Sequence, residues 1–183
     1  MIALHEREDN MENSFKKWTS MLSKNYKESR RNAWFAVNGE MLSFYYELGR
    51  EIHESIFRED PDFFKNLSVE LTKDKVSVLV FSENNLRNIE LFYILNGEIM
   101  NELASDLSED GYLSKVTALS ETMIEKMCKI SWSHFLIIIN TCLYNPRKAW
   151  FYINKIAENN WSKSSLTNAI SSGLYEKAQS FKN

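Results

Sequence analysis

The chain is poor in the residues that build tight turns, since its 183 residues include only 5 glycines and 2 prolines. A sheet-rich fold of this length needs many such turns, so this scarcity favours helices. Cys128 and Cys142 are the two cysteines, and they form neither a CxxC motif nor a disulfide framework. No apolar run reaches the ~18 residues of a membrane span. The charged start, MIALHEREDN, lacks the apolar core of a signal peptide, so the cytoplasm is the expected location.

Length and composition bound the fold and the partners. Hydrophobic residues make up 44% of the chain, which is enough for a real core. The formal net charge is -3, so the chain as a whole is not a basic coat for nucleic acid, and any such binding needs a local patch. We expect an N-terminal extension over residues 1–20 and one helical domain over residues 21–183.

A long apolar stripe dominates the first third of the chain. Its members recur at spacings of three and four, which indicates one face of a helix: Trp34, Val37, Met41, Phe44, Tyr45, Leu48, Ile52 and Ile56. The stripe predicts a helix from Ser23 to Phe57, preceded by a shorter helix from Glu12 to Leu22. A stripe this long needs much cover, which predicts a homo-oligomer whose interface includes Trp34, Met41, Tyr45, Tyr46 and Ile52.

Capping signals divide the rest of the chain into further helices. Asp60-Pro61 predicts a helix start, and Lys75–Phe81 predicts a buried turn or short strand. A helix should then run from Ser82 to a stop at Gly97, and an irregular segment should cover Glu98–Gly111. The remaining helices are expected over Ser120–Cys128, from a cap at Ser131 or Ser133 through Cys142, from Asn145-Pro146 to Glu158, and from Ser162 to Gln179. The expected fold class is therefore mostly α, with a long N-terminal helix.

No motif predicts catalysis, and we expect the chain not to be an enzyme. Ser133-His134 sits at a helix start, where adjacent residues rarely face each other, and a GxSxG elbow is missing, so a structural role is favoured. The histidines and cysteines show no metal-ligand spacing. Asp60-Pro61-Asp62 and Glu125-Lys126-Met127 are the nearest fragments to a nuclease acid pair, but neither lies in a strand-like run. We therefore predict no catalytic residue, cofactor or metal site.

Two helix–turn–helix candidates and one basic cluster point toward DNA. The first candidate joins Phe63–Lys73 to the helix after Ser82, and the second joins Arg147–Glu158 to the helix after Ser162. Such helices read DNA with basic and amide side chains. Together with the basic cluster Lys16–Arg31, they predict DNA contacts from Lys16, Lys17, Arg30, Arg31, Asn85, Arg87, Lys148 and Lys163.

Four segments resemble the YhcG-like family in order and spacing: AVNGEMLSFYYELGREI (36–52), FSENNLRNIELFY (81–93), SWSHFLIII (131–139) and FYINKIAENNWSKSSLTNAISSGLYEK (151–177). The resemblance implies an N-terminal winged-helix-like domain that precedes a PD-(D/E)xK nuclease domain in proteins of restriction or defence systems. The sequence departs from the family pattern in three ways. The nuclease domain is not in the sequence, Ser164 and Asn168 stand where Arg is usual, and so does Ala149.

The resemblance and the residues leave two functions open. The first is a non-catalytic DNA-binding module of a nuclease-associated or restriction-associated protein. The alternative is a protein–protein interaction or dimerisation module of such an assembly, without direct DNA contact. A nuclease or restriction-system subunit is then an expected partner. The large rings of Trp132, Trp161, Tyr45 and Tyr152 are expected in the core in either case.

Overall fold

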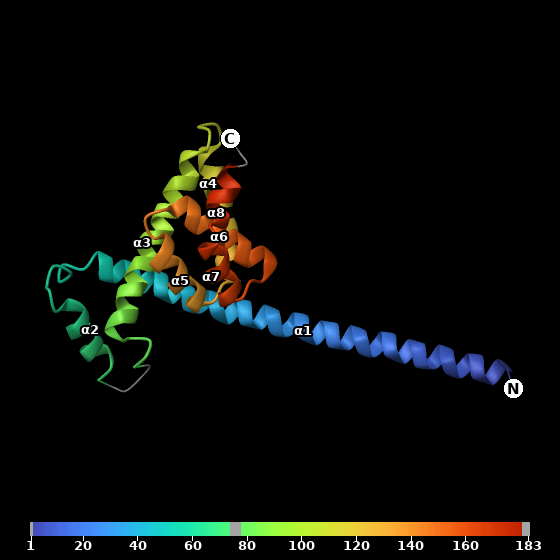
Figure 1. Ribbon diagram of the computed structural model, residues 1–183. Helices are drawn as coiled ribbons and strands as arrows, with labels where there is room; N and C mark the ends of the chain where they lie inside the picture. The colour runs from blue at the N-terminus through green and yellow to red at the C-terminus, as the bar shows by residue number, and fades with distance from the viewer. Residues whose placement is uncertain (1, 74–77, 181–183) are drawn as a thin grey trace. The chain divides into compact units, whose positions relative to one another are not determined.

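The computed structural model describes residues 2–73 and 78–180, with side chains from Asn13 onward. These residues form helices and no strand, which confirms the mostly α fold class with a long N-terminal helix (Figure 1). The helices are α1 (Ile2–His53), α2 (Phe63–Leu71), α3 (Glu83–Ser105), α4 (Tyr112–Met127), α5 (Trp132–Cys142), α6 (Pro146–Asn159), α7 (Lys163–Ser171) and α8 (Leu174–Ser180). The chain forms two compact units, Met1–Val37 and Asn38–Asn183, which we describe one at a time.

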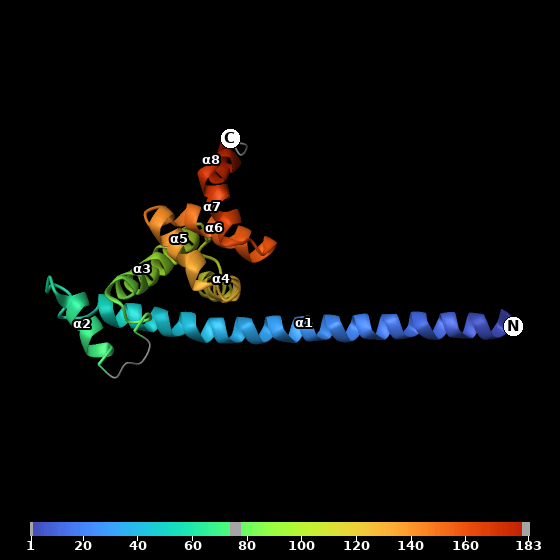
Figure 2. The same ribbon diagram turned by 60° about the horizontal axis from the view of Figure 1, so that its bottom comes forward.

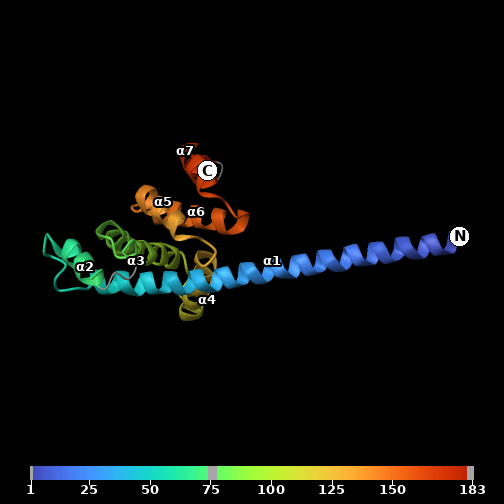
Figure 3. The same cartoon turned by 90° about the horizontal axis from the view of Figure 1, so that it is seen from below.

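Helix α3 is the centre of the second unit, because it contacts α2, α4, α5 and α6. Leu86, Ile89 and Ile99 on α3 are fully buried. Figure 2 shows α2 beside the start of α3. Figure 3 shows α5 leading into α6, and both of these helices contact α3. The helix is buried along a broad apolar side that faces these neighbours, while Asn84, Arg87 and Glu98 lie on its exposed side. The core thus forms where α3 meets these four helices.

Residues 38–53 of α1 belong to the second unit and are fixed there by the Asn38 amide and by close packing at two glycines, since a Cβ atom on Gly39 would lie 3.0 Å from Cys128 Sγ. The Asn38 side chain is buried, and its Nδ2 donates to the Cys128 and Ile130 carbonyls, each at 2.8 Å. A Cβ atom on Gly49 would lie 2.5 Å from the Ile89 carbonyl oxygen, so only glycine permits this approach of α1 to α3. The glycines therefore mark close packing inside a helix rather than breaks in it.

The four aromatic residues expected in the core lie in it or against it. Tyr152 is fully buried and Tyr45 is nearly so, while Trp132 and Trp161 are half-buried and pack against the core. The cap at Asn145 is confirmed, since its side chain accepts from the Lys148 amide at 2.9 Å and Pro146 opens α6. The stop after α6 is confirmed too, because Asn160 has a left-handed backbone with φ of 50°.

Several element boundaries differ from the prediction. The two expected N-terminal helices are one helix, α1, since no residue of Glu12–Ser23 breaks it. Asp60-Pro61 forms a turn in which Asp60 Oδ1 accepts from the Asp62 amide, and α2 begins only at Phe63. Gly97 does not end α3, which continues to Ser105. A glycine inside a long helix costs only about 1 kcal/mol, so neighbouring contacts overrule it.

Three further expectations are corrected or limited. Residues 74–77 lie outside the described residues, and residues 78–81 form a turn, which was one of the two predicted alternatives. Val80 and Phe81 pack against the core, but the burial expected for Leu79 is corrected, since it is 88% exposed. Helix α4 begins at Tyr112, eight residues before Ser120, so the expected irregular segment shrinks to residues 106–111. The last helix is divided at Gly173, whose φ of 65° separates α7 from α8.

Candidate functional site

The first unit carries a basic face along one helix. The basic side chains between residues 16 and 31 are exposed and cluster on one side of α1 at 100° per residue: Lys16, Lys17, Lys24, Lys27, Arg30 and Arg31. Lys24 lies 3.9 Å from Glu28, and the Arg30 guanidinium lies 5.8 Å from the Tyr26 ring. We call these six residues the basic face.

The opposite side of the same helix is apolar. Phe15, Trp18, Leu22 and Tyr26 follow at spacings of three and four and are 60%, 52%, 45% and 63% exposed. Val37 continues this side eleven residues after Tyr26 and is also exposed. Helix α1 is thus amphipathic between residues 15 and 31, with basic side chains on one side and aromatic rings on the other, whereas Trp34, three residues after Arg31, lies on the basic side. We call the side that holds Phe15, Trp18, Leu22 and Tyr26 the apolar face.

The DNA-contact residues predicted outside α1 are mostly engaged within the fold. Asn85 donates to the Val80 carbonyl at 2.8 Å and accepts from Trp132 Nε1 at 2.9 Å, so both ends of its amide hold the core. Arg87 pairs with Glu83 and stacks on the Phe64 ring. Lys148 donates to Glu176 at 2.6 Å, and this ion pair raises the pKa of Lys148.

Of the residues near α7 that the sequence analysis singled out, some are exposed and one is buried. Lys163 is exposed at the start of α7, where the Ser162 hydroxyl caps the helix by accepting from the Ser165 amide at 3.1 Å. Ser164 and Asn168 are exposed as well. Ala149 is fully buried, so its position faces the core and offers no surface contact.

The predicted dimer interface is partly core. Tyr45 and Ile52 are buried within the second unit, so they are not exposed to a second chain, and the prediction was wrong for these two residues. Tyr45 packs on the Trp132 ring with centroids 4.6 Å apart. Trp34, Met41 and Tyr46 remain exposed by a third or more. The stripe read from the sequence combined two different faces of α1, because tertiary packing changes along the helix.

The Ser-Trp-Ser-His segment forms a hydrogen-bonded chain. His134 Nε2 lies 3.1 Å from the Trp161 carbonyl, which can only accept, so Nε2 carries the proton and Nδ1 accepts from Ser131 Oγ at 2.7 Å. Ser133 Oγ lies 2.9 Å from Ser131 Oγ. Burial lowers the pKa of His134, which keeps the ring neutral.

This cluster ties α5 to the turn before α7. Ser131 is the N-cap residue of α5, but its hydroxyl binds His134 and makes no cap bond to the helix. The predicted helix start at Ser131 is therefore confirmed, but its hydroxyl does not make the expected cap bond. The sequence signal for the pair is the spacing of three between Ser131 and His134, which places both on one side of the first helical turn.

A second polar cluster was missed in the sequence. Glu90 lies within the apolar run of α3 and is buried, with a side chain 5% exposed. Arg58 donates to it through Nε at 2.7 Å and Nη2 at 3.0 Å, and His53 Nδ1 lies 3.4 Å away. The guanidinium of Arg58 also lies 4.7 Å from the Phe64 ring. A lone carboxylate in an apolar helix face is the signal that could have indicated a buried ion pair.

The fragments considered for nuclease chemistry are dispersed surface pairs. Glu125 accepts from Lys129 at 2.7 Å, and this bond lowers the pKa of the carboxyl. Lys126 instead lies over the Trp150 ring and reaches Glu158 at 3.6 Å. Among the described residues, no three His, Cys, Asp or Glu side chains are grouped as metal ligands. In the same part of the chain, no helix has the length and apolarity that crossing a bilayer requires.

Residues 21–177 match the family model described as the DUF1016 N-terminal domain, which covers most of the chain. No curated protein and no solved structure matches it.

Proposed function

The chain belongs to the DUF1016 N-terminal domain family, the family of YhcG-like proteins, and from this premise we propose that it is a non-catalytic DNA-binding module. The nuclease activity of such an assembly would reside in a PD-(D/E)xK domain outside this sequence, within a restriction or defence system. The observation that carries the proposal is the basic face of α1. It concentrates six bases within sixteen residues of a chain whose net charge is -3.

The geometry of the basic face suits a phosphate backbone. Lys16 and Arg31 are separated by about 22 Å along the helix at 1.5 Å per residue. Duplex DNA carries one negative charge per ~1.7 Å of axis, so a helix of this length meets several phosphates. Long, exposed lysine and arginine side chains can follow these phosphates without reading bases. We therefore expect binding with little sequence preference.

A helix–turn–helix formed by α6 and α7 is the second part of the proposal. The turn at Asn160 and the cap at Ser162 set the start of α7. Its exposed side chains include Lys163, Ser164 and Asn168, which can donate or accept hydrogen bonds at a groove. With one base on this helix, its contribution to affinity is smaller than that of α1. The winged-helix-like character implied by the resemblance rests on this pair.

The test compares two variants of equal charge. The first replaces Lys17, Lys27 and Arg31 by Gln on the basic face, and the control replaces Lys65, Lys73 and Lys177 by Gln elsewhere. Fluorescence anisotropy with a labelled duplex at low salt should show that the affinity for DNA falls by roughly tenfold or more in the first variant only. Equal losses would mean that net charge alone matters. The absence of binding by the unaltered chain at low salt would reject DNA binding.

The apolar face supports a second candidate, a dimerisation module. Its exposed side chains, together with Met21 and Val37, are six in number. A large side chain can bury ~150–250 Å², so if each of the six buries half of that area, the surface buried per chain is on the order of 500 Å². Two copies would bury on the order of 1,000 Å², where specific interfaces begin. Because the basic face lies on the other side of α1, a dimer formed this way leaves both basic faces outward.

Sedimentation tests the dimer. Trp18→Glu with Leu22→Glu should give a monomer at concentrations where the unaltered chain is a dimer, because two carboxylates would have to be buried. Ser20→Glu with Ser23→Glu adds the same charge on the basic side and should leave the dimer intact. An unaltered chain that is monomeric at high micromolar concentration contradicts this candidate.

A further inference from the structure

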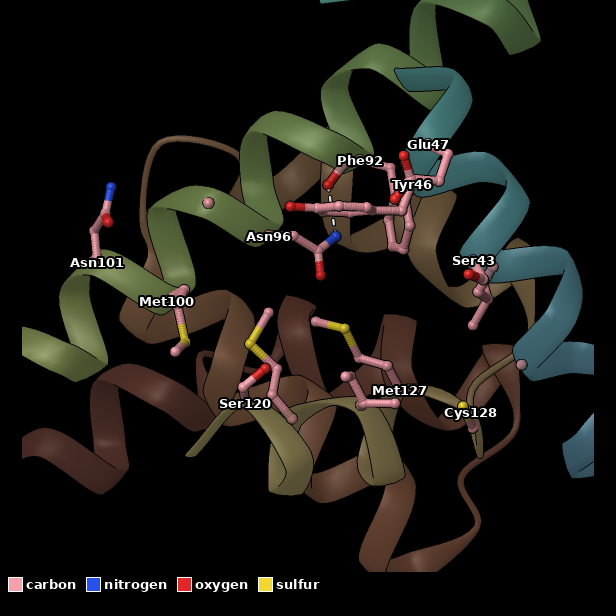
Figure 4. A pocket seen from close by; sticks show the side chains of 15 residues that line it. Ser43, Tyr46, Glu47, Phe92, Asn96, Met100, Asn101, Ser120, Met127 and Cys128 are labelled. Atoms are coloured by element: carbon pink, nitrogen blue, oxygen red, sulfur yellow. Dashed lines mark hydrogen bonds between the residues drawn. The ribbon is translucent and has the colours of Figure 1, made fainter. Parts of the chain in front are cut away.

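A cavity of about 510 Å³ lies within the second unit, between residues 39–47 of α1 and the helices α3 and α4 (Figure 4). Its apolar wall includes Phe92 and three methionines, Met100, Met123 and Met127. Volumes of about 300–1,000 Å³ are typical of sites that bind small molecules. Methionine side chains adapt to the shape of a ligand, and their sulfur atoms make favourable contacts with aromatic rings.

One buried amide points into this cavity. Asn96 is only 7% exposed, and its Nδ2 donates to the Phe92 carbonyl at 2.6 Å. Because a carbonyl can only accept, this bond fixes which end of the amide is oxygen. Figure 4 shows that oxygen directed toward the methionines across the cavity. It receives no hydrogen bond from the residues that the structure describes, so it presents an acceptor to whatever enters.

The charge of the wall selects among ligands. The fifteen lining residues include no lysine, arginine or histidine. The one charged side chain is Glu47, which accepts from Arg50 at 2.7 Å. An anionic ligand such as a nucleotide would lose its hydration without gaining a cation, which is unfavourable. The cavity therefore suits neutral or cationic molecules.

We propose that this cavity binds a flat aromatic ligand with an N–H donor, of the indole class, and that the donor meets the Asn96 oxygen. The ring would pack between Phe92 and the methionines. A buried acceptor that stays unmatched beside a ligand costs free energy, so a ring without the donor binds less well. The proposal concerns a cavity of the second unit and is independent of the DNA-binding proposal, whose main observation is the basic face of the first unit.

Methionine methyl resonances provide the test, since the chain has 7 methionines and, of those whose side chains the structure describes, only Met100, Met123 and Met127 line the cavity. Titration of ¹³C-methyl-methionine protein with indole should shift Met100, Met123 and Met127 saturably, and leave Met21 and Met41 unchanged. 1-Methylindole, which lacks the donor, should bind about fivefold more weakly. Indole-3-acetate should bind more weakly than tryptamine, because indole-3-acetate is an anion and tryptamine is a cation, and the cavity wall has no cationic side chain.

Two substitutions separate the cavity from its surroundings. Gly97→Leu should abolish the shifts by filling the space, and it should fold, because a Cβ there meets nothing within 4 Å. Glu98→Leu adds the same side chain beside the cavity and should bind normally. Asn96→Leu should make indole and 1-methylindole equal. The proposal is overturned if shifts fail to saturate, if both ligands bind the unaltered chain equally, or if Gly97→Leu binds as well as Glu98→Leu.

Discussion

Arg58 holds the buried carboxylate of Glu90 through two hydrogen bonds, Nε to Oε1 at 2.7 Å and Nη2 to Oε2 at 3.0 Å. The two residues come from different segments, the turn after α1 and the middle of α3. The same guanidinium lies on the Phe64 ring of α2. This one pair therefore connects α2, α3 and the turn after α1, because a buried carboxylate requires a cation from whichever segment can reach it.

Arg58→Met should destabilise the fold by about 1–3 kcal/mol, because it leaves the Glu90 carboxylate buried without its cation. The figure stays below the cost of a fully buried pair because the Arg58 side chain is 40% exposed. Urea denaturation measures it. Arg50→Met is the matched control, since Arg50 pairs with exposed Glu47, and it should leave the stability almost unchanged. Adding Glu90→Leu to Arg58→Met should recover part of the loss, and a further loss would show that the pair is not coupled as described.

Gly49→Ala should destabilise by about 2 kcal/mol or more, although alanine is the better helix former. The new Cβ would stand 2.5 Å from the Ile89 oxygen and 2.8 Å from Tyr93 Cβ, so α1 and α3 would have to separate. Gly97→Ala should have the opposite effect. A Cβ atom there meets nothing within 4 Å, so the variant should be more stable by about 0.5–1 kcal/mol. Thermal unfolding of both variants decides. A stabilised Gly49→Ala would contradict the close approach of the helices.

The fold class and most helices could be predicted from local sequence, whereas many of the residues at which the helices begin or end could not. Asn145-Pro146 and Ser162 fixed two starts correctly, because capping depends on adjacent residues. Gly97 was misread as a stop, since only the surrounding helices decide whether a glycine inside a helix is tolerated. Lys75–Phe81 suggested burial by its composition, yet Val78 and Leu79 are exposed. Apolar composition indicates what can be buried, and not what finds a partner.

The site residues show the same division between local and tertiary information. Helix periodicity alone predicts that Lys17 and Arg31 share one side of α1. Asn85 looked like a residue for reading bases, but it bridges Val80 and Trp132, which lie 5 and 47 positions away. Glu90 and Arg58 are 32 residues apart, and no local pattern joins them. The cavity beside Asn96 needs three helices at once, so no single segment could reveal it.

Lowering the pH should weaken the fold through His134. Burial holds its pKa below the ordinary value, with the carbonyls of Trp161 and Ser162 acting in the other direction and Lys163 lowering it further. The unfolded chain gains the proton near pH 6.5, before the folded chain does. The stability of the neutral ring is therefore full above pH 6.5 and is lost as the pH falls from there toward the folded pKa.

The measurement is urea denaturation at pH 7.5 and 5.5 for the chain and for His134→Gln. Between these two pH values the free energy of unfolding of the unaltered chain should fall by up to about 1.4 kcal/mol for each unit by which the pKa of His134 is lowered. In His134→Gln this contribution to the pH dependence should be missing. Ser131→Ala is a useful companion, since it removes the donor to Nδ1 but keeps the titrating ring. An identical pH dependence in the chain and in His134→Gln would contradict a lowered pKa.

The salt dependence of DNA binding should report the basic face directly. If roughly four of its bases neutralise phosphates, log affinity should fall with log salt at a slope near -3.6, at ~0.9 per contact. Affinity at physiological salt should then be on the order of micromolar, as for sequence-independent binding. Lys17→Ala and Arg31→Ala should each flatten the slope by about one unit. Arg87→Ala should change it little, because that guanidinium already pairs with Glu83 and stacks on Phe64. Anisotropy titrations at four salt concentrations supply the slopes, and a slope that responds to Arg87→Ala but not to Arg31→Ala would move the interface from α1 to α3.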